Sequence, residues 1–348
     1  MERRSRRTRI LRWWRLPFWT LALFTGAKSF ADNPIIGSRR LNRAGLHVWR
    51  LKAAHALAWS RRRRLARLLP AELRKQFDRD GFIVVRDFLP HDAFDQLQSD
   101  LLNTELPGRV HQQGDTLTRR FAIGPELRAR FPQLDLLLDS PTWKGVMSYV
   151  ASTRSQPLYY IQSILGGVAD GPPDPQLQLH ADTFHPSMKA WLFLTDVEED
   201  GRPLTYVAGS HRASHERLAW EQRRSVTVLD DGDRLSQRGS LRIAAGELPA
   251  LALPQPTSFA VPANTLVVID TFGFHARADS NRPTKRVELW AFSRRTPFLP
   301  WTGGDLLSLP AFADRRAGWI NSLNDWADRR GWKKQHWTPE NLRRPIDG

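Results

Sequence analysis

The chain has 348 residues, an apolar fraction of 41% and a formal net charge of +16. This length and apolar content suit one large globular domain or two small ones. The absence of cysteine excludes disulfides and thiolate metal sites, so any bound metal must take histidine or carboxylate ligands.

The positive charge is concentrated at the N-terminus. Residues 1–75 hold 20 Lys and Arg against three acidic residues, a net charge of +17, whereas the remaining 273 residues hold 32 basic and 33 acidic residues. We therefore predict a near-neutral domain preceded by a basic appendage, a difference that bears on binding partners rather than on the fold.

Residues 1–69 predict a basic, Trp-rich arm. Residues 1–12 form a basic tail, and residues 13–24 are aromatic and apolar but too short to span a bilayer. Residues 26–37 are expected to form a loop. Residues 41–69 are expected to form one long helix or two, with five apolar residues at helical spacing: Leu46, Trp49, Ala53, Ala56 and Leu57.

Three interpretations of this arm compete. Trp beside Arg is typical of an interfacial segment, so the arm is a candidate peripheral anchor on an anionic membrane. A basic helical arm that packs on the domain or binds another polyanion is the second, and a cleaved export signal is the third. We find no nucleic-acid reader motif and do not expect nucleic acid as a partner. We expect the protein in the cytoplasm and, if the arm is a membrane anchor, at the inner face of the membrane.

A domain is predicted over residues 70–300. A short helix over residues 73–80 precedes a strand with the pattern D-G-F-x-V-V-x-x-F-L, and a helix follows over residues 91–102. Residues 126–150 predict a helix pair. Residues 158–165 predict a strand, on which Gln162 is a candidate for contact with a co-substrate or an ordinary polar strand residue.

The central stretch runs from Gln176 to Arg212. Its first residues alternate as in a strand, which places His180 and Asp182 on one face. A lone His-x-Asp often marks only a hydrogen-bonded strand end. Held side by side, however, the pair supplies two thirds of a 2-His-1-carboxylate metal triad. A buried strand over residues 189–197 follows, then an acidic turn and the segment Ala208-Gly209-Ser210-His211-Arg212.

Two later strands complete the pattern. His275 follows the apolar run 266–269 and is the candidate third ligand. Arg286 opens the strand 286–292, and a guanidinium fixed on a strand can bind a carboxylate through two hydrogen bonds. Four residues in this order are far more specific than any one of them alone.

These motifs resemble the phytanoyl-CoA dioxygenase family of iron- and 2-oxoglutarate-dependent oxygenases, from about Gln76 to Arg295. The resemblance implies a mainly β fold with flanking helices, a double-stranded β-helix or jelly-roll, cupin-like barrel. It implies Fe(II) on His180, Asp182 and His275, with 2-oxoglutarate and O2 as co-substrates. Arg286 would bind the distal carboxylate of 2-oxoglutarate, and Trp191 would contact the co-substrate or simply pack in the core.

The substrate is less constrained. We expect hydroxylation of an unactivated C–H of a small molecule, and the arm favours a lipid or an acyl chain. The alternatives are a non-catalytic barrel that only binds, and a different metal-dependent enzyme on the same barrel. A charged insertion over residues 212–256 is a candidate lid. His185 is expected at the substrate mouth or in a surface loop, and the Trp-rich residues 301–348 are expected to form a helical extension on the barrel.

Overall fold

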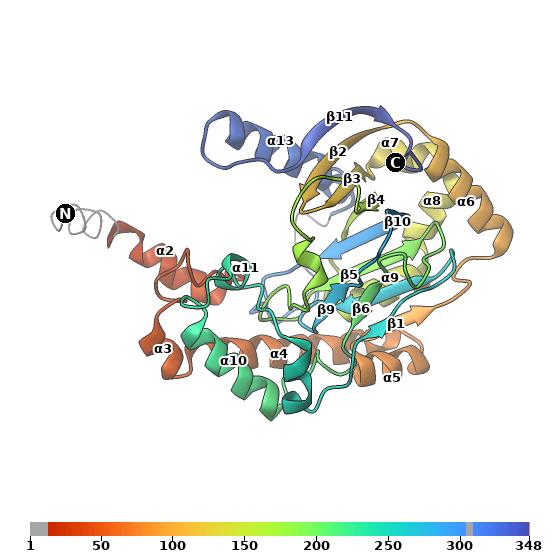
Figure 1. Ribbon diagram of the computed structural model, residues 1–348. Coiled ribbons are helices and arrows are strands. Elements are labelled where there is room, and N and C mark those ends of the chain that lie inside the picture. Colours follow the sequence, from red (N-terminus) through yellow and green to blue (C-terminus); the bar gives the residue numbers. More distant parts are fainter. Residues whose placement is uncertain (1–12, 304–308, 348) are drawn as a thin grey trace.

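The computed structural model describes residues 13–303 and 309–347 (Figure 1). The predicted basic tail, residues 1–12, lies outside the described part. The fold is built on an antiparallel sheet of eight strands. In spatial order these are β1 (Phe82–Val85), β8 (Leu266–Asp270), β5 (Met188–Phe193), β10 (Thr284–Ser293), β4 (Leu158–Gly166), β3 (Thr116–Ala122), β2 (Leu106–Gln113) and β11 (Thr338–Arg343).

A second, smaller sheet holds three short antiparallel strands. Its order is β7 (Thr257–Ser258), β6 (Leu204–Tyr206) and β9 (His275–Arg277). The predicted fold class, mainly β with flanking helices, is confirmed, and the sheets are antiparallel. The large sheet is not closed into a barrel, because β1 and β11 form its two edges and do not pair with each other within the described ranges.

Each face of the large sheet carries its own apolar core. Residues of one parity, such as Leu192 and Leu289, pack against the helices that follow the arm. Residues of the other parity, such as Phe193 and Val267, pack against Tyr206 and other residues of the smaller sheet. The continuous apolar runs of β5 and β8 therefore serve two cores, as expected for strands covered on both faces.

Five helices that follow the arm contribute to the core on one face of the large sheet, and α4 (Leu46–Leu65) of the arm adds Leu65. The five are α5 (Ala71–Asp80), α6 (His91–Asn103), α7 (Pro125–Arg130), α8 (Pro132–Asp139) and α9 (Pro141–Ala151). The predicted pair over residues 126–150 is thus three helices. Each of the three begins with a proline in its first turn, where the missing N–H costs no hydrogen bond.

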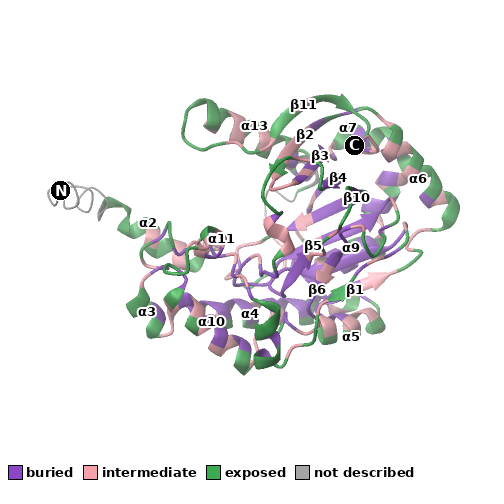
Figure 2. Cartoon of the chain, viewed as in Figure 1, coloured by how far each residue is buried: buried purple, intermediate pink, exposed green. Residues whose placement is uncertain are grey.

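The arm divides into an exposed and a packed part. The exposed part is η1 (Trp13–Arg15), α2 (Leu16–Leu21) and η2 (Ala22–Phe24); the packed part is α3 (Arg39–Arg43), α4 (Leu46–Leu65) and η3 (Ala66–Leu68). Figure 2 shows α2 exposed and one side of α4 buried. The predicted apolar stripe on α4 is wrong. The buried side of the helix is formed mainly by the residues that follow the predicted ones, and it includes Arg50, Arg61 and Arg62.

The insertion and the C-terminal residues are mostly helical. The insertion forms α10 (His215–Thr227), α11 (Arg234–Gln237) and η5 (Ala245–Leu251), and α10 contacts α3 and α4. The C-terminal residues form α12 (Pro310–Ala313) and α13 (Arg316–Arg329), and the unpredicted strand β11 extends the large sheet beside β2. None of the helices in the described part of the chain is long and apolar enough to cross a membrane.

Candidate metal centre

The segment that carries His180 and Asp182 is less regular than predicted. A turn of 3-10 helix, η4 (Pro175–Leu177), replaces the start of the expected strand. His180 then pairs with His275 through two backbone hydrogen bonds of 3.0 Å, and the Asp182 N–H donates to the Thr271 carbonyl at 2.9 Å. The predicted alternation of side chains therefore holds at His180 and Asp182, because backbone hydrogen bonds keep the chain extended there as in a strand.

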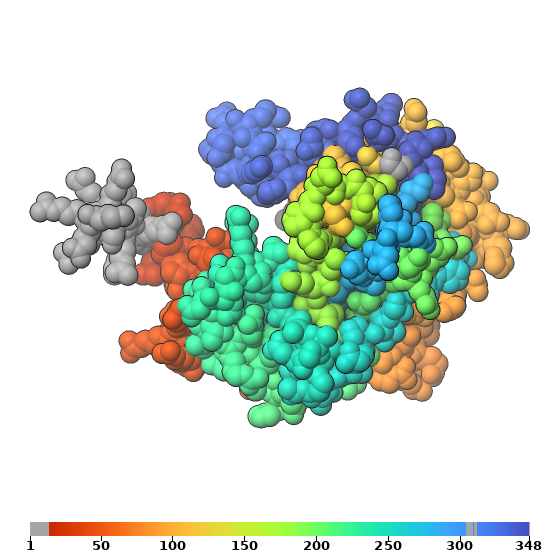
Figure 3. Space-filling view, in the orientation of Figure 1, coloured from red at the N-terminus to blue at the C-terminus, as the bar shows by residue number. Residues whose placement is uncertain are grey.

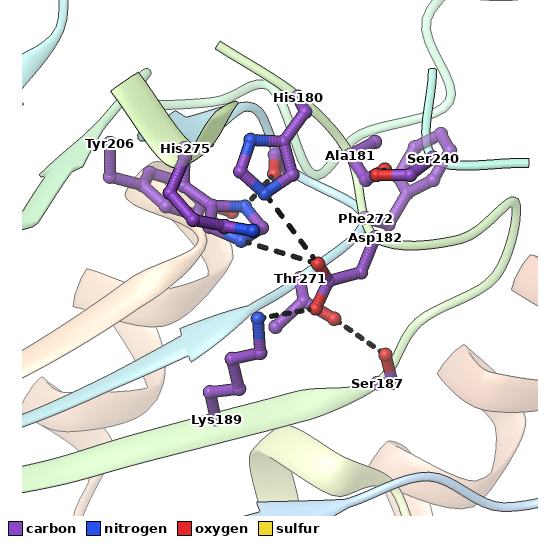
Figure 4. Close-up of polar contacts among 12 residues, drawn as sticks. His180, Ala181, Asp182, Ser187, Lys189, Tyr206, Ser240, Thr271, Phe272 and His275 are labelled. Atoms are coloured by element: carbon purple, nitrogen blue, oxygen red, sulfur yellow. Dashed lines mark hydrogen bonds and ion pairs between the residues drawn. The ribbon is translucent and has the colours of Figure 1, made fainter. Parts of the chain in front are cut away.

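The structure brings His180, Asp182 and His275 together (Figure 4), with one ligand atom of each within 4.8 Å of the others. The Nε2 atoms of both histidines lie 3.7 Å from Asp182 Oδ1. Each Nδ1 lies against a backbone carbonyl, that of Gln178 at 2.8 Å and that of Gly273 at 2.9 Å. These contacts place the proton on Nδ1 and leave the Nε2 lone pairs facing Asp182.

The charge states suit a cation. Burial lowers the pKa of His275 to about 4 and that of His180 well below its usual value, so both rings are neutral at pH 7. Burial alone would raise the pKa of Asp182, but Lys189 and the two histidines outweigh it and lower that pKa. Two neutral imidazoles and one carboxylate are the donor set of the 2-His-1-carboxylate triad.

Two further observations fit a metal ion. The N–O separations of 3.7 Å are too long for hydrogen bonds but suit atoms that share one ion. His275 Nε2 is buried and has no hydrogen-bond partner among the described residues. A buried nitrogen of this kind is costly unless a ligand completes it.

The turn that carries His275 is braced from the arm. Arg62 of α4 forms an ion pair of 2.8 Å with Asp270, and both side chains are at most 1% exposed. Asp270 also accepts hydrogen bonds from the N–H groups of Phe272 and Ser187, and its carbonyl accepts one from Tyr206 at 2.9 Å. The arm therefore takes part in positioning a ligand, a role that sequence reasoning missed.

Two lysines that the sequence did not single out as site residues lie at Asp182. Lys189 Nζ is 2.7 Å from Asp182 Oδ2 (Figure 4), and Lys28 of the arm donates to the Asp182 carbonyl. Burial lowers the pKa of Lys28 to about 8; Asp182 opposes this effect, and Arg294 and Lys189 add to it. Period-two spacing placed Lys189 beside Trp191, but nothing in the local sequence marked Lys28.

A cavity of about 140 Å3 adjoins the two histidines. Three other predicted site residues line it: Arg286, Trp191 and Gln162. Arg286 and Gln162 belong to a polar network across β3, β4 and β10, whereas Trp191 lies on β5 in an apolar cluster. Arg120 donates to Gln162 at 2.8 Å, Gln162 donates to Glu288 at 2.8 Å, and Arg286 lies 3.2 Å from Glu288. The roles assigned to these residues remain predictions.

A larger cavity of about 410 Å3 opens beside Asp182. It shares Arg120, Lys189, Trp290 and Trp337 with the smaller one. The arm contributes Lys28 to its wall, and α13 contributes Ile320, Asn321 and Asn324. His185, expected at the substrate mouth or on the surface, is instead fully buried, with Nδ1 3.0 Å from the Pro186 carbonyl.

The family comparison agrees with this site. The model of the family described as phytanoyl-CoA dioxygenase (PhyH) matches residues 77–235. This chain contains a phytanoyl-CoA dioxygenase domain. The matched range includes His180 and Asp182 and ends before His275 and Arg286, so the match is shorter than the resemblance seen in the sequence. No curated protein matches the chain in sequence.

Several solved structures are similar to the chain. The epimerase SnoN from nogalamycin biosynthesis is 19% identical, with 70% of this chain and 93% of that chain covered and a TM-score of 0.42. HygX from Streptomyces hygroscopicus, with nickel and 2-oxoglutarate bound, is 20% identical, with 64% of this chain and 86% of that chain covered and a TM-score of 0.38. EctD from S. alaskensis, with bound Fe, is 18% identical, with 72% of this chain and 84% of that chain covered and a TM-score of 0.36.

The phytanoyl-CoA dioxygenase domain and the His-Asp-His site together define the enzyme class. The protein is a 2-oxoglutarate-dependent oxidoreductase, and its cofactors are iron and 2-oxoglutarate. The predictions of the family, the enzyme class and these cofactors are confirmed.

Proposed function

We propose that this protein hydroxylates an unactivated C–H of a small molecule at an iron held by His180, Asp182 and His275. The observation that carries the proposal is the convergence of three ligand atoms within 4.8 Å beside a cavity. One of them is a buried nitrogen that has no hydrogen-bond partner in the described part of the chain. Two histidines and one carboxylate leave metal positions open for 2-oxoglutarate and oxygen. The bound iron and 2-oxoglutarate supply the oxidising chemistry.

The chain's own residues would bind 2-oxoglutarate and orient it in the smaller cavity. Arg286 would hold the distal carboxylate of 2-oxoglutarate in the smaller cavity. Its guanidinium is fixed from two sides, because it pairs with Glu288 and donates to the Arg202 carbonyl. Trp191 would close one wall of that cavity, and Gln162 would contact the co-substrate while it orients Arg120. Fixing these donors in advance lowers the cost of binding.

The first test is an anaerobic titration with Fe(II) and then 2-oxoglutarate, followed by the visible metal-to-ligand charge-transfer band. We expect a band in the wild type and in the control His215→Ala, a histidine at the exposed start of α10. His180→Ala should lose it. A folded, iron-loaded wild type with no band would instead support a non-catalytic binding protein or another metal-dependent enzyme.

Arg286 is tested by the concentration of 2-oxoglutarate that half-saturates the same band. Arg286→Met should raise this concentration by about tenfold or more, the loss expected for a charge-assisted pair. Lys285→Met is the matched control, because Lys285 neighbours Arg286 on β10 and is exposed. Equal values for the two variants would remove Arg286 from the co-substrate site.

The substrate we propose is a lipid or an acyl chain, met at an anionic membrane surface. Support comes from the apolar side chains on the first part of the arm, of which Trp14, Phe18 and Leu21 are each more than 60% exposed. Arg15 stacks on Trp14, and indoles with nearby cations are typical of membrane-surface segments.

Vesicle sedimentation tests this surface. Trp14→Ser with Phe18→Ser should lower binding to phosphatidylglycerol vesicles several-fold. Leu136→Ser, an equally exposed apolar residue on α8, should leave binding unchanged. Equal binding by all three proteins would refute the anchor.

A further inference from the structure

We propose that the substrate carries an anionic group, which binds in the larger cavity beside the metal centre to Lys28, Arg120 and Arg294. This inference rests on the proposed function, and it places the substrate of that reaction in the larger cavity. It names the residues of this chain that would hold that group.

The charge of the cavity wall is the first observation. Only one of the lining side chains is acidic, that of Asp182. Five are basic: Lys28, Arg109, Arg120, Lys189 and Arg294. Two of the five are already neutralised, since Lys189 pairs with Asp182 and Arg109 pairs with Asp325 of α13. Three cations remain.

These three have no carboxylate partner within ion-pair distance in the described part of the chain. Lys28 donates to the Asp182 carbonyl, and Arg294 donates to the Gly26 carbonyl at 2.9 Å. Arg120 donates to the neutral amide of Gln162. Backbone and amide acceptors orient a cation but do not neutralise it. Cations gathered in a cavity repel one another, and a bound anion relieves that repulsion.

Arg120 is held ready for such a ligand. Its guanidinium lies over the rings of Trp290 and Trp337, with centroid distances of 4.0 and 4.3 Å. Stacking on two indoles fixes the plane of the guanidinium, so little side-chain freedom is lost when an anion binds. A guanidinium in a fixed plane favours phosphate and carboxylate groups, which accept two parallel hydrogen bonds.

The position of the three cations limits where the anionic group can lie. Lys28 and Arg294 are joined through residues 26–28 of the arm, and Lys28 reaches the backbone of a metal ligand. Figure 3 shows a hollow between the arm and the C-terminal segment, and the cavity wall includes residues of both. The anionic group therefore lies between this opening and the metal centre, and the arm takes part in selecting the substrate.

Inorganic sulfate is a suitable probe, because it is a small dianion. Anaerobic protein loaded with Fe(II) and 2-oxoglutarate is titrated with sulfate by calorimetry. Lys28→Met and Arg294→Met should each weaken sulfate binding about tenfold, the loss of one charge-assisted hydrogen bond. Their matched controls are Lys52→Met and Arg63→Met, exposed residues of α4 whose side chains do not line the cavity. Both controls should bind sulfate as the wild type does.

The charge-transfer band separates this inference from the proposed function. Lys28→Met and Arg294→Met should keep the band, because neither residue belongs to the triad or lines the smaller cavity. A wild type without the band refutes the proposed function. A band in every protein, with sulfate binding absent or equal in all variants, refutes the anionic site alone.

Two further probes identify the molecule that carries the anionic group. Glycerol 3-phosphate represents a soluble substrate, and vesicles of phosphatidylglycerol against phosphatidylcholine represent a lipid headgroup. Preferential binding to the anionic vesicles that falls in Lys28→Met and Arg294→Met places the group on a lipid. Binding of glycerol 3-phosphate that falls in the same variants, with equal vesicle binding, places it on a soluble molecule. Failure of the two variants to alter either probe overturns the proposal.

Discussion

Arg62→Met should be among the most damaging single changes in the arm. Arg62 and Asp270 are at most 1% exposed and lie 2.8 Å apart. Without the guanidinium, the Asp270 carboxylate keeps only the N–H groups of Phe272 and Ser187, at 3.0 and 3.3 Å. Removing one partner of a buried pair costs about 3–5 kcal/mol. This is a large part of a total stability of about 5–15 kcal/mol.

The sign of the pH dependence provides a second check. Burial already raises the pKa of Asp270, and Arg62 opposes that rise. In Arg62→Met the folded-state pKa rises further while the unfolded-state value stays, so the folded variant binds more protons. Its stability should then fall as pH rises through the folded-state pKa. We expect a smaller cost at pH 5 than at pH 8.

Urea unfolding of the metal-free protein measures both effects. Asp270→Asn removes the charge, so the double variant with Arg62→Met should be more stable than Arg62→Met alone, a coupling of about 0.5–3 kcal/mol. Arg63→Met on the exposed side of α4 is the control. A cost below about 1 kcal/mol, or no recovery in the double variant, would refute this account of how the arm braces the metal centre.

Three further outcomes follow from particular contacts. Gly273→Ala should cost about 1–3 kcal/mol by overpacking, because its Cβ would lie 1.8 Å from the Tyr206 hydroxyl and 2.3 Å from the ring carbon that bears it. Gly246→Ala, which meets open space, is the control and should be neutral by urea unfolding. Burial lowers the pKa of His55, His185 and His211, that of His185 to about 3. The free energy of unfolding measured in urea should therefore fall between pH 6.5 and pH 5, by up to about 1.4 kcal/mol per pH unit for each histidine; a free energy of unfolding that is constant over that range would contradict it. Arg119→Met should loosen β11, because Arg119 pairs with Glu340 at 2.9 Å, and faster amide exchange confined to β2 and β11 would confirm this.

The pairing of His180 with Asp182 was predictable because its information is local. His180 and Asp182 are two residues apart, and the strand-like backbone pairing at His180 keeps them on one side. His275 follows the apolar run that becomes β8 and opens the next strand, β9, and its role as third ligand came from the family resemblance. Period-two alternation needs no knowledge of the rest of the chain.

The contacts around the triad were not predictable in that way. Lys28 meets Asp182 across 154 residues, and Arg62 meets Asp270 across 208. β11 joins β2, and its residues read as a polar tail rather than as a strand. Long-range pairs of this kind leave no mark on the local pattern of either partner. The Trp-rich C-terminal residues accordingly predicted only helix.

The helix α4 shows why a correct element can still be given the wrong face. Hydrophobic spacing favoured a stripe through Trp49, which is 51% exposed. The buried side instead carries Arg50 and Arg61, whose guanidinium groups donate to backbone carbonyls, among them those of Ala27 and Ser152. Arginine stems cover apolar surface while the head group finds acceptors. A hydrophobic scale therefore places such residues on the wrong side.

This burial changes what the charge of the arm means. Arg50, Arg61 and Arg62 count toward the N-terminal excess, yet they are occupied within the fold. Deleting residues 1–69 would remove these three as well as the apolar part of α4, so a loss of vesicle binding would report unfolding as readily as a lost anchor. The membrane question therefore belongs to the exposed apolar residues of the first part of the arm, and the substrate question to Lys28, which the same arm carries into the cavity.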